Sequence, residues 1–233
     1  SAEVHGIGKL MFANSVPHRF AFLCPWLDIM GTETNWVRDG GWKPASDDWM
    51  NFKRAMCYQK PYLFLMNTHY DRFTPELVEK YFQRCLFYGM YPSMFSHNAA
   101  ESPYWQAPEL YNRDRPLFKR YIPLIKRVAE AGWEPVTYAT SSADSIYVER
   151  FGPDAQGNVY LTLLNDSAEP QEAVIHIQRG ALNVAAVSEV MDILSVTHLP
   201  VHQADDALQV TVHLSAEQAR VLWLPRTIDA SGK

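Results

Sequence analysis

Polar side chains that could move protons follow short apolar runs in the first half of this chain. Glu33 ends one such run, and Asp71 follows another. A carboxyl group in a partly apolar site can hold or release a proton near neutral pH, which suits it to general acid or base catalysis. We therefore predict Glu33 and Asp71 as catalytic carboxylates.

Amide, imidazole and aromatic side chains accompany these carboxylates. The chain has seven Trp and twelve Tyr, several of them in the segments that connect the apolar runs. Aromatic faces on loops are a common way to hold sugar rings, and amide or imidazole groups can hydrogen-bond hydroxyl groups. The residues that we predict as substrate contacts are Asn14, Trp36, Asn67, His69, Tyr70, His97, Asn98 and Trp105.

Most of these residues also have a structural alternative. Glu33 could be an exposed loop glutamate or a helix-capping partner, and Asp71 could pair with its neighbour or help to start a helix. Asn14 could serve a turn, and Trp105 could pack against the second half of the chain. Asp28 is expected to be structural, because it falls on the opposite face of an extended strand, about 16 Å from Glu33.

Several kinds of site are not indicated by the sequence. The eight histidines show no HExxH motif and no other close pairing, so we predict no metal. The chain has no GxSxG motif, no GxGxxG motif and no P-loop, so nothing favours a serine hydrolase or a nucleotide-binding protein. We therefore expect no cofactor.

Four β/α units in succession would position the predicted site residues. Apolar runs at residues 10–14, 27–33, 62–67 and 90–95 are each followed by a polar segment and a helical pattern. Continuous apolar runs are typical of parallel strands that helices cover on both faces. We therefore expect half of a (β/α)8-type barrel, with the polar residues just past the carboxyl ends of the strands, where such barrels carry their active sites.

Capping residues predict where the helices of these units begin. Thr74 and Gly89 bracket one helix, and Asp114 is expected to cap the next. Another helix is expected to begin after Ser46. The helix of the first unit is predicted to be short, at residues 18–23.

After Trp133 the pattern changes to short, β-branched segments bounded by turn residues. Leu208, Val210, Val212 and Leu214 alternate with polar residues, which predicts a strand with one buried face. Several such strands favour an antiparallel β-sandwich. The fold class is thus α/β plus all-β, with a half-barrel domain at residues 1–138, a β-sandwich domain at 139–228 and a disordered tail at 229–233.

The composition limits the partners and the compartment. The 233 residues are 47% hydrophobic and carry a formal net charge of −5. An acidic chain with no basic block is a poor candidate for nucleic acid or anionic membranes, and no apolar run approaches the roughly 20 residues of a membrane span. Three cysteines in apolar contexts are interpreted as reduced core residues, which favours the cytoplasm and leaves a secreted or periplasmic location open.

The order of these parts resembles that of many glycoside hydrolases, in which a β/α barrel precedes a small β-domain. One segment resembles a barrel strand that delivers a carboxylate into a sugar site, and two look like the last two barrel strands: residues 27–36 (LDIMGTETNW), 62–70 (YLFLMNTHY) and 90–98 (MYPSMFSHN). Three further segments are similar to strands of the trailing β-domain: residues 146–165 (IYVERFGPDAQGNVYLTLLN), 187–194 (VSEVMDIL) and 216–224 (AEQARVLWL). The resemblance implies a glycosidase fold and a carbohydrate substrate.

The resemblance covers only the C-terminal half of such a barrel. A complete barrel typically takes about 250 residues, whereas the predicted half-barrel domain here is residues 1–138. In many retaining families one catalytic carboxylate lies on the fourth strand, which has no counterpart here, and the strand matching the nucleophile strand of others ends in Asn67. The usual pair of carboxylates in one chain is therefore in question.

Half a barrel leaves two sheet edges unpaired and its inner face open, which invites association. We expect a homodimer that completes the eight strands around a two-fold axis, with each composite site drawing carboxylates from both chains. The predicted function is hydrolysis of glycosidic bonds by carboxylate acid–base chemistry. The alternative is a non-catalytic carbohydrate-binding or scaffold fragment of a larger glycosidase.

Overall fold

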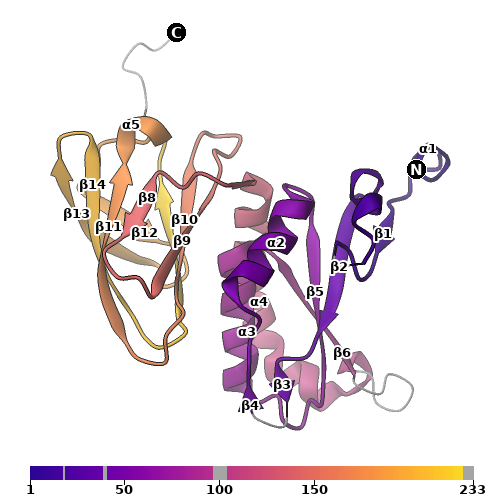
Figure 1. The fold of residues 1–233 in the computed structure, drawn as a ribbon. Helices are drawn as coiled ribbons and strands as arrows, with labels where there is room; N and C mark the ends of the chain where they lie inside the picture. Colours follow the sequence, from indigo (N-terminus) through magenta and orange to yellow (C-terminus); the bar gives the residue numbers. More distant parts are fainter. Residues whose placement is uncertain (18, 39–40, 97–103, 228–233) are drawn as a thin grey trace. The chain divides into compact units, whose positions relative to one another are not determined.

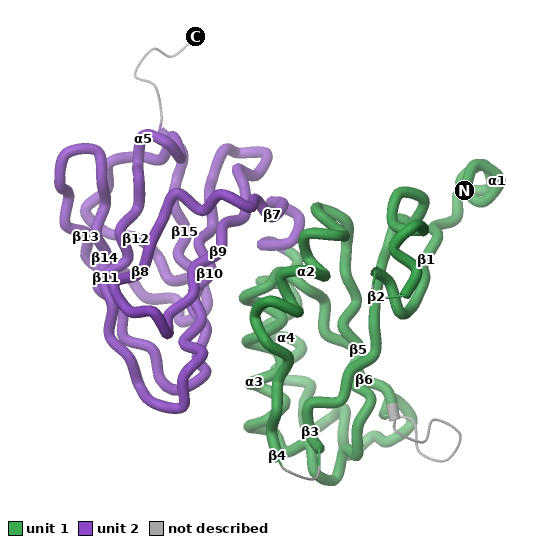
Figure 2. The backbone as a smooth tube through the Cα atoms, viewed as in Figure 1, with its two compact units in different colours: residues 1–126 green, residues 127–233 purple. Residues whose placement is uncertain are grey.

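The computed structural model describes residues 1–17, 19–38, 41–96 and 104–227. The chain divides into two compact units, residues 1–126 and 127–233 (Figure 2). The first unit contains a parallel sheet with helices and the second an antiparallel sheet, so the fold is mixed α/β. That residues 1–138 and 139–228 fold as separate domains stays a prediction, and the predicted tail at 229–233 lies outside the described residues.

Four strands form a parallel sheet in the first unit (Figure 1). The strands β1 (Phe12–Ala13), β2 (Ile29–Thr34), β5 (Tyr62–Thr68) and β6 (Tyr91–Ser96) are hydrogen-bonded in the order β1-β2-β5-β6, and each neighbouring pair is parallel. Each of the four predicted apolar runs therefore contains a strand. Because the strands are parallel, their carboxyl ends meet at one edge of the sheet.

Capping residues set the bounds of α2 (Asp47–Cys57) and α3 (Pro75–Tyr88). The hydroxyl oxygens of Ser46 and Thr74 accept the backbone N–H groups of Trp49 and Leu77, as predicted for helix starts. Gly89 ends α3 in the left-handed region, with a φ of 64°. Both helices lie on the same face of the parallel sheet (Figure 1).

Two predicted helices differ from the observed ones. The helix expected at residues 18–23 is a 3-10 helix, η1 (Ala21–Trp26), and α4 (Pro108–Ala131) begins six residues before Asp114. Asp114 is therefore buried inside α4 and does not cap it. Its carboxylate accepts hydrogen bonds from Arg113 and from the Tyr104 hydroxyl, while Pro108 fits the first turn of a helix, where its missing N–H is not needed.

Burial alternates along β5, which runs through the middle of the sheet. Phe64 and Met66 are fully buried on the face that α2 and α3 cover, and Phe64 contacts Tyr81 of α3. Leu63 and Leu65 point to the other face and are half-buried. The structure thus buries one face of the sheet and leaves the other partly exposed, whereas the continuous apolar runs had predicted burial of both faces.

The second unit is an antiparallel sheet of nine strands in the order β7-β9-β10-β15-β12-β13-β14-β11-β8. These strands are hydrogen-bonded in one continuous sheet that curls around a core, with β13 paired to β12 through residues 197–200 and to β14 through residues 201–204. That they pack as a two-sheet β-sandwich stays a prediction. Their bounds are β7 (Trp133–Glu134), β8 (Ala139–Ser141), β9 (Ile146–Phe151), β10 (Val159–Asn165), β11 (Gln171–Gln178), β12 (Glu189–Asp192), β13 (Thr197–Ala204), β14 (Ala207–Leu214) and β15 (Ala219–Leu224).

The alternation predicted from the sequence decides which side chains enter this core. Leu208, Val210, Val212 and Leu214 of β14 are all buried, as expected, and they join one cluster with residues of β9, β10, β11 and β15. Residues 187–194, which resemble a strand of the trailing β-domain, contain the short strand β12 at Glu189–Asp192. The remaining short elements of the chain are α1 (Ala2–Gly6), β3 (Val37–Arg38), β4 (Gly41–Trp42), η2 (Tyr104–Gln106) and α5 (Arg179–Leu182).

Candidate active site

Asn14, Glu33 and Asn67 meet at the carboxyl ends of three neighbouring parallel strands. The side-chain amide of Asn14 donates to Glu33 Oε1 at 2.7 Å, and that of Asn67 donates to Glu33 Oε2 at 3.1 Å. The strand register explains the meeting, because Glu33 pairs with Leu65 across β2 and β5, and Asn67 follows Leu65 on the same face. Three of the predicted site residues therefore form one hydrogen-bonded cluster.

The orientation of the Asn14 amide is fixed by a second contact. The backbone N–H of Ser15 donates to Asn14 Oδ1 at 2.7 Å, so the oxygen of this amide faces the backbone and its nitrogen faces Glu33. Asn67 Oδ1 is buried and has no hydrogen-bond partner among the described residues. Glu33 itself is exposed, so its carboxylate can be reached from solvent.

Apolar side chains flank Glu33 on the open face of the sheet. A Cβ atom on Gly31 would lie 2.8 Å from the Leu63 carbonyl oxygen and 2.9 Å from the Phe12 ring, so Phe12 lies over the face that also carries Glu33. Phe95 pairs with Asn67 across β5 and β6 and shares that face. Phe12 and Phe95 are both exposed, which gives the cluster a partly apolar border.

Two predicted substrate contacts turn inward in the structure. Trp36 is 1% exposed and packs against Trp42, Phe64 and Tyr81. Tyr70 is 6% exposed, and its hydroxyl lies within hydrogen-bond distance of the carbonyl oxygens of Met66 and Phe95. Desolvation by burial raises the pKa of Tyr70 well above its usual range. The Tyr70 hydroxyl contacts both β5 and β6, and Trp36 packs between β5 and α3, so the two residues have structural roles.

The remaining predicted residues lie beyond the ends of β5 and β6. His69 and Asp71 are exposed in the turn after β5, where the backbone N–H of Arg72 donates to the His69 carbonyl. Trp105 in η2 is 55% exposed, with one part of its ring system against Tyr104. His97 and Asn98 lie outside the described residues, so their contact with a substrate stays a prediction.

Asp28 lies toward the other end of β2, where sequence reasoning expected a structural role. The Met11 backbone N–H and the His5 ring both contact its carboxylate, at 2.7 Å and 2.8 Å. These two contacts, the Met11 hydrogen bond above all, hold the pKa of Asp28 below its ordinary value. Asp28 therefore ties the segment before β1 to β2.

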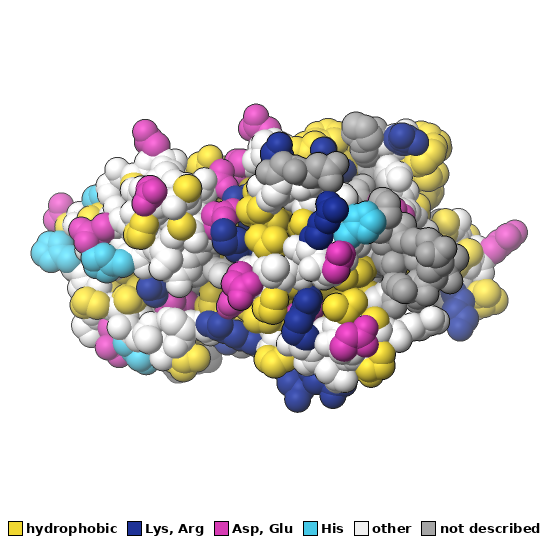
Figure 3. Space-filling view, turned by 90° about the horizontal axis from the view of Figure 1, so that it is seen from below, with side chains coloured by type: hydrophobic (Ala, Val, Ile, Leu, Met, Phe, Trp, Pro, Cys, Tyr) yellow, Lys and Arg dark blue, Asp and Glu magenta, His cyan; other side chains and the backbone are white. Residues whose placement is uncertain are grey.

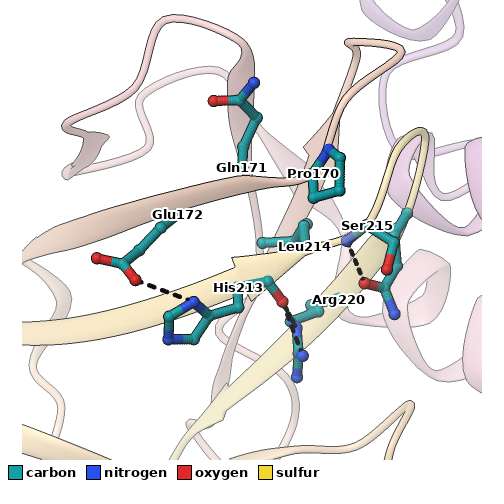
Figure 4. A pocket seen from close by; sticks show the side chains of 8 residues that line it. Pro170, Gln171, Glu172, His213, Leu214, Ser215 and Arg220 are labelled. Carbon is teal, nitrogen blue, oxygen red and sulfur yellow. Dashed lines mark hydrogen bonds and ion pairs between the residues drawn. The ribbon is translucent and has the colours of Figure 1, made fainter.

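A hollow of about 430 Å³ lies on the second unit (Figure 4), where the sequence predicted no site. Its polar groups already have partners: His213 pairs with Glu172 at 3.0 Å, and Arg220 donates to the His213 carbonyl and to Asp192. No Phe, Tyr or Trp is among its lining residues, which are Pro170, Gln171, Glu172, His213, Leu214, Ser215, Gln218 and Arg220. Because its polar groups are already paired and it has no large aromatic face, the cluster around Glu33 is the stronger candidate.

Charge and metal-binding groups are spread out in the described part of the chain. No three His, Cys, Asp or Glu side chains of the described residues are grouped so that they could hold a metal ion. On the face in Figure 3, acidic and basic side chains are intermingled with apolar ones. None of the described helices combines the length and apolar character that crossing a lipid bilayer requires.

Comparison with known proteins gives a fold but no family. No family model and no curated protein matches this chain. Three solved structures resemble it: a Bacteroides fragilis protein provisionally named an α-galactosidase (13% identity, TM-score 0.55), a noncanonic maltogenic α-amylase from Thermotoga neapolitana (9%, 0.54) and α-galactosidase I from Mortierella vinacea (12%, 0.53). The chain therefore has a glycosidase-like fold.

The matches cover nearly all of this chain but only part of the other proteins. The aligned share of this chain is 94%, 97% and 96%, in the same order, and the share of the solved structures is 48%, 57% and 60%. The chain thus spans about half to three-fifths of the length of the proteins that it resembles.

Proposed function

We propose that this protein hydrolyses glycosidic bonds, with Glu33 and Asp71 as its carboxylates. The observation that carries the proposal is the Asn14–Glu33–Asn67 cluster, because it combines an exposed carboxylate with the carboxyl ends of parallel strands in a glycosidase-like fold. Its three free, buried cysteines fit our proposal of a cytoplasmic protein.

Glycoside hydrolysis usually requires two carboxyl groups with different roles. One protonates the leaving oxygen, and the other acts as a base toward water or as a nucleophile toward the sugar. The exposed Asp71 is our candidate for the carboxyl group that works with Glu33. We expect the substrate to lie against Phe12 and Phe95 and to contact the predicted residues after β5 and β6, which include His69, His97, Asn98 and Trp105.

We propose that two copies of the chain associate and complete the barrel. Among the described residues, β1 is paired only with β2 and β6 only with β5, so both outer edges of the parallel sheet can accept a further strand. Pairing β6 of one copy with β1 of the other would use both edges and cover the open face. A second Glu33 or Asp71 would then face each site, as the composite-site hypothesis requires.

Hydrolysis of a panel of aryl glycosides tests this function. We expect wild-type protein to cleave at least one sugar of the panel, and Glu33→Gln to lower kcat/KM at least about 10³-fold, because a neutral amide cannot replace the carboxylate. Glu109→Gln, an exposed change at the start of α4, is the matched control and should retain wild-type activity. Equal rates from wild type and Glu33→Gln would remove Glu33 from the site.

The alternative function is carbohydrate binding or scaffolding without catalysis, as part of a larger glycosidase. The partial coverage of the solved structures favours this candidate, because a barrel of the usual size needs about 250 residues. Binding of oligosaccharides without turnover by the wild-type protein would support this alternative and contradict the enzyme.

A further inference from the structure

Glu33 is the one member of the cluster that carries charge, and both of its oxygens are already hydrogen-bonded. Asn14 holds Oε1 and Asn67 holds Oε2. The two amides come from different chain segments, after β1 and within β5. The Glu33 carboxylate on β2 is therefore hydrogen-bonded from both sides. Loss of either amide would leave the Glu33 side chain with more rotational freedom.

In both contacts the asparagine side chain is the hydrogen-bond donor and the Glu33 oxygen is the acceptor. The Ser15 N–H can only donate, so Asn14 must present Oδ1 to it and its NH2 group to Glu33. Turning the Asn67 amide over would place Oδ1 against Glu33 Oε2, which is repulsive unless Glu33 carries a proton. The observed arrangement therefore matches an ionised Glu33.

A protonated Glu33 would lose part of this arrangement. Its hydrogen would sit on an oxygen that faces an NH2 group, so that oxygen would be a weaker acceptor, and the charge-assisted bonds to an ionised carboxylate are roughly twice as strong as neutral ones. Each carboxylate oxygen has a second lone pair, and Glu33 is exposed, so the anion can still accept from a substrate.

We propose that Asn14 and Asn67 are positioning residues that hold Glu33 as an anion, so that Glu33 accepts from the substrate or stabilises positive charge and another group supplies the proton. This inference rests on the proposed function. It narrows the expectation that Glu33 acts as an acid or a base, and it replaces the expectation that the two asparagines contact the substrate.

Leaving-group dependence tests the role of Glu33. The assay compares 2,4-dinitrophenyl and phenyl glycosides of the sugar that wild type cleaves best. A dinitrophenolate leaves without a proton, so loss of a proton donor spares that substrate. We expect Glu33→Gln to slow both substrates by a similar factor, about 10³-fold. Near-normal cleavage of the dinitrophenyl glycoside alone would overturn the anionic role.

The asparagine variants test positioning. We expect Asn14→Ala and Asn67→Leu each to lower kcat about 10- to 100-fold with KM nearly unchanged, because a misplaced catalytic group impairs the chemical step. A raised KM with unchanged kcat would mean that the asparagines contact the substrate, and it would overturn the proposal.

A measurement independent of activity separates this inference from the proposed function. The side-chain NH2 signals of Asn14 and Asn67 in ¹⁵N NMR spectra can be assigned by their loss in the two asparagine variants. We expect both to shift in Glu33→Gln and to stay in place in Glu109→Gln. Unshifted signals would overturn the positioning of Glu33 by the two asparagines, even in an active enzyme. Shifted signals in a protein that cleaves no glycoside would contradict the proposed function alone.

Discussion

Lys53 occupies an unusual position for a charged residue, on the inner face of α2 with Met50 and Cys57. It is fully buried, and its ammonium group has no hydrogen-bond partner among the described residues. The only compensation described is the Trp49 ring, whose centre lies 4.0 Å from Nζ. Desolvation lowers the pKa of Lys53 to about 8.

Replacing this lysine should stabilise the protein. The unfolded chain binds a proton at Lys53 up to a pKa near 10.4 and the folded chain only to about 8, so stability rises with pH between these values. We expect Lys53→Met to gain about 1–3 kcal/mol at pH 7 and much less at pH 10. Urea unfolding of both proteins at the two pH values measures this, and a less stable variant at pH 7 would contradict it.

At the scale of single residues, the sequence located the cluster but not the inward-facing aromatics. Asn14, Glu33 and Asn67 end or follow apolar runs, so parallel pairing alone brings them together. Trp36 and Tyr70 follow the strand ends in the same way, yet both are buried. Whether an aromatic residue after a strand turns outward or inward depends on the space left by α3 and by the neighbouring strand, which its own segment does not encode.

At the scale of elements, β2 and β5 can approach each other closely because Gly31 has no side chain. A Cβ atom there would meet the Leu63 carbonyl oxygen at 2.8 Å, and the backbone of a paired strand cannot easily withdraw. The same approach sets the distance between Glu33 on β2 and Asn67 on β5. The position of this glycine therefore affects both strand pairing and the geometry of the cluster.

Adding that one methyl group should weaken the sheet. We expect Gly31→Ala to lower the free energy of unfolding by about 1–3 kcal/mol, because overpacking forces the backbone to shift. Gly6→Ala is the matched control, since nothing lies within 4 Å of the added atom. Thermal unfolding of the two variants measures the difference, and equal midpoints would show that β2 and β5 can separate without cost.

Short sequence patterns predicted individual helices and strands better than the way in which these elements pair and pack. The caps at Ser46, Thr74 and Gly89 act within a few residues, so the sequence revealed them. The start of α4 was placed too late, because Asp114 has the side chain of a capping residue but is buried against Arg113 and Tyr104. The single curled sheet of the second unit depends on pairings between distant strands, such as β8 with β11, which no local pattern specifies.

At the scale of the whole molecule, the open face of the parallel sheet is suited to association with a second molecule. Phe12 and Phe95 are exposed on it, and its outer strands have unpaired edges among the described residues. Exposed apolar patches beside free strand edges favour association. A second copy brings the same surface twice, as a symmetric dimer requires, and it would use both edges at once.

Light scattering coupled to size-exclusion chromatography tests this assembly. At micromolar concentration we expect a particle of twice the 26.7 kDa chain mass. Phe95→Asp should reduce it to a monomer, because a charge on the open face would have to be buried without a partner. Val196→Asp, in an exposed turn of the second unit, is the control and should stay dimeric. A monomeric wild type would contradict the homodimer, and glycoside cleavage by that monomer would place both carboxylates in one chain.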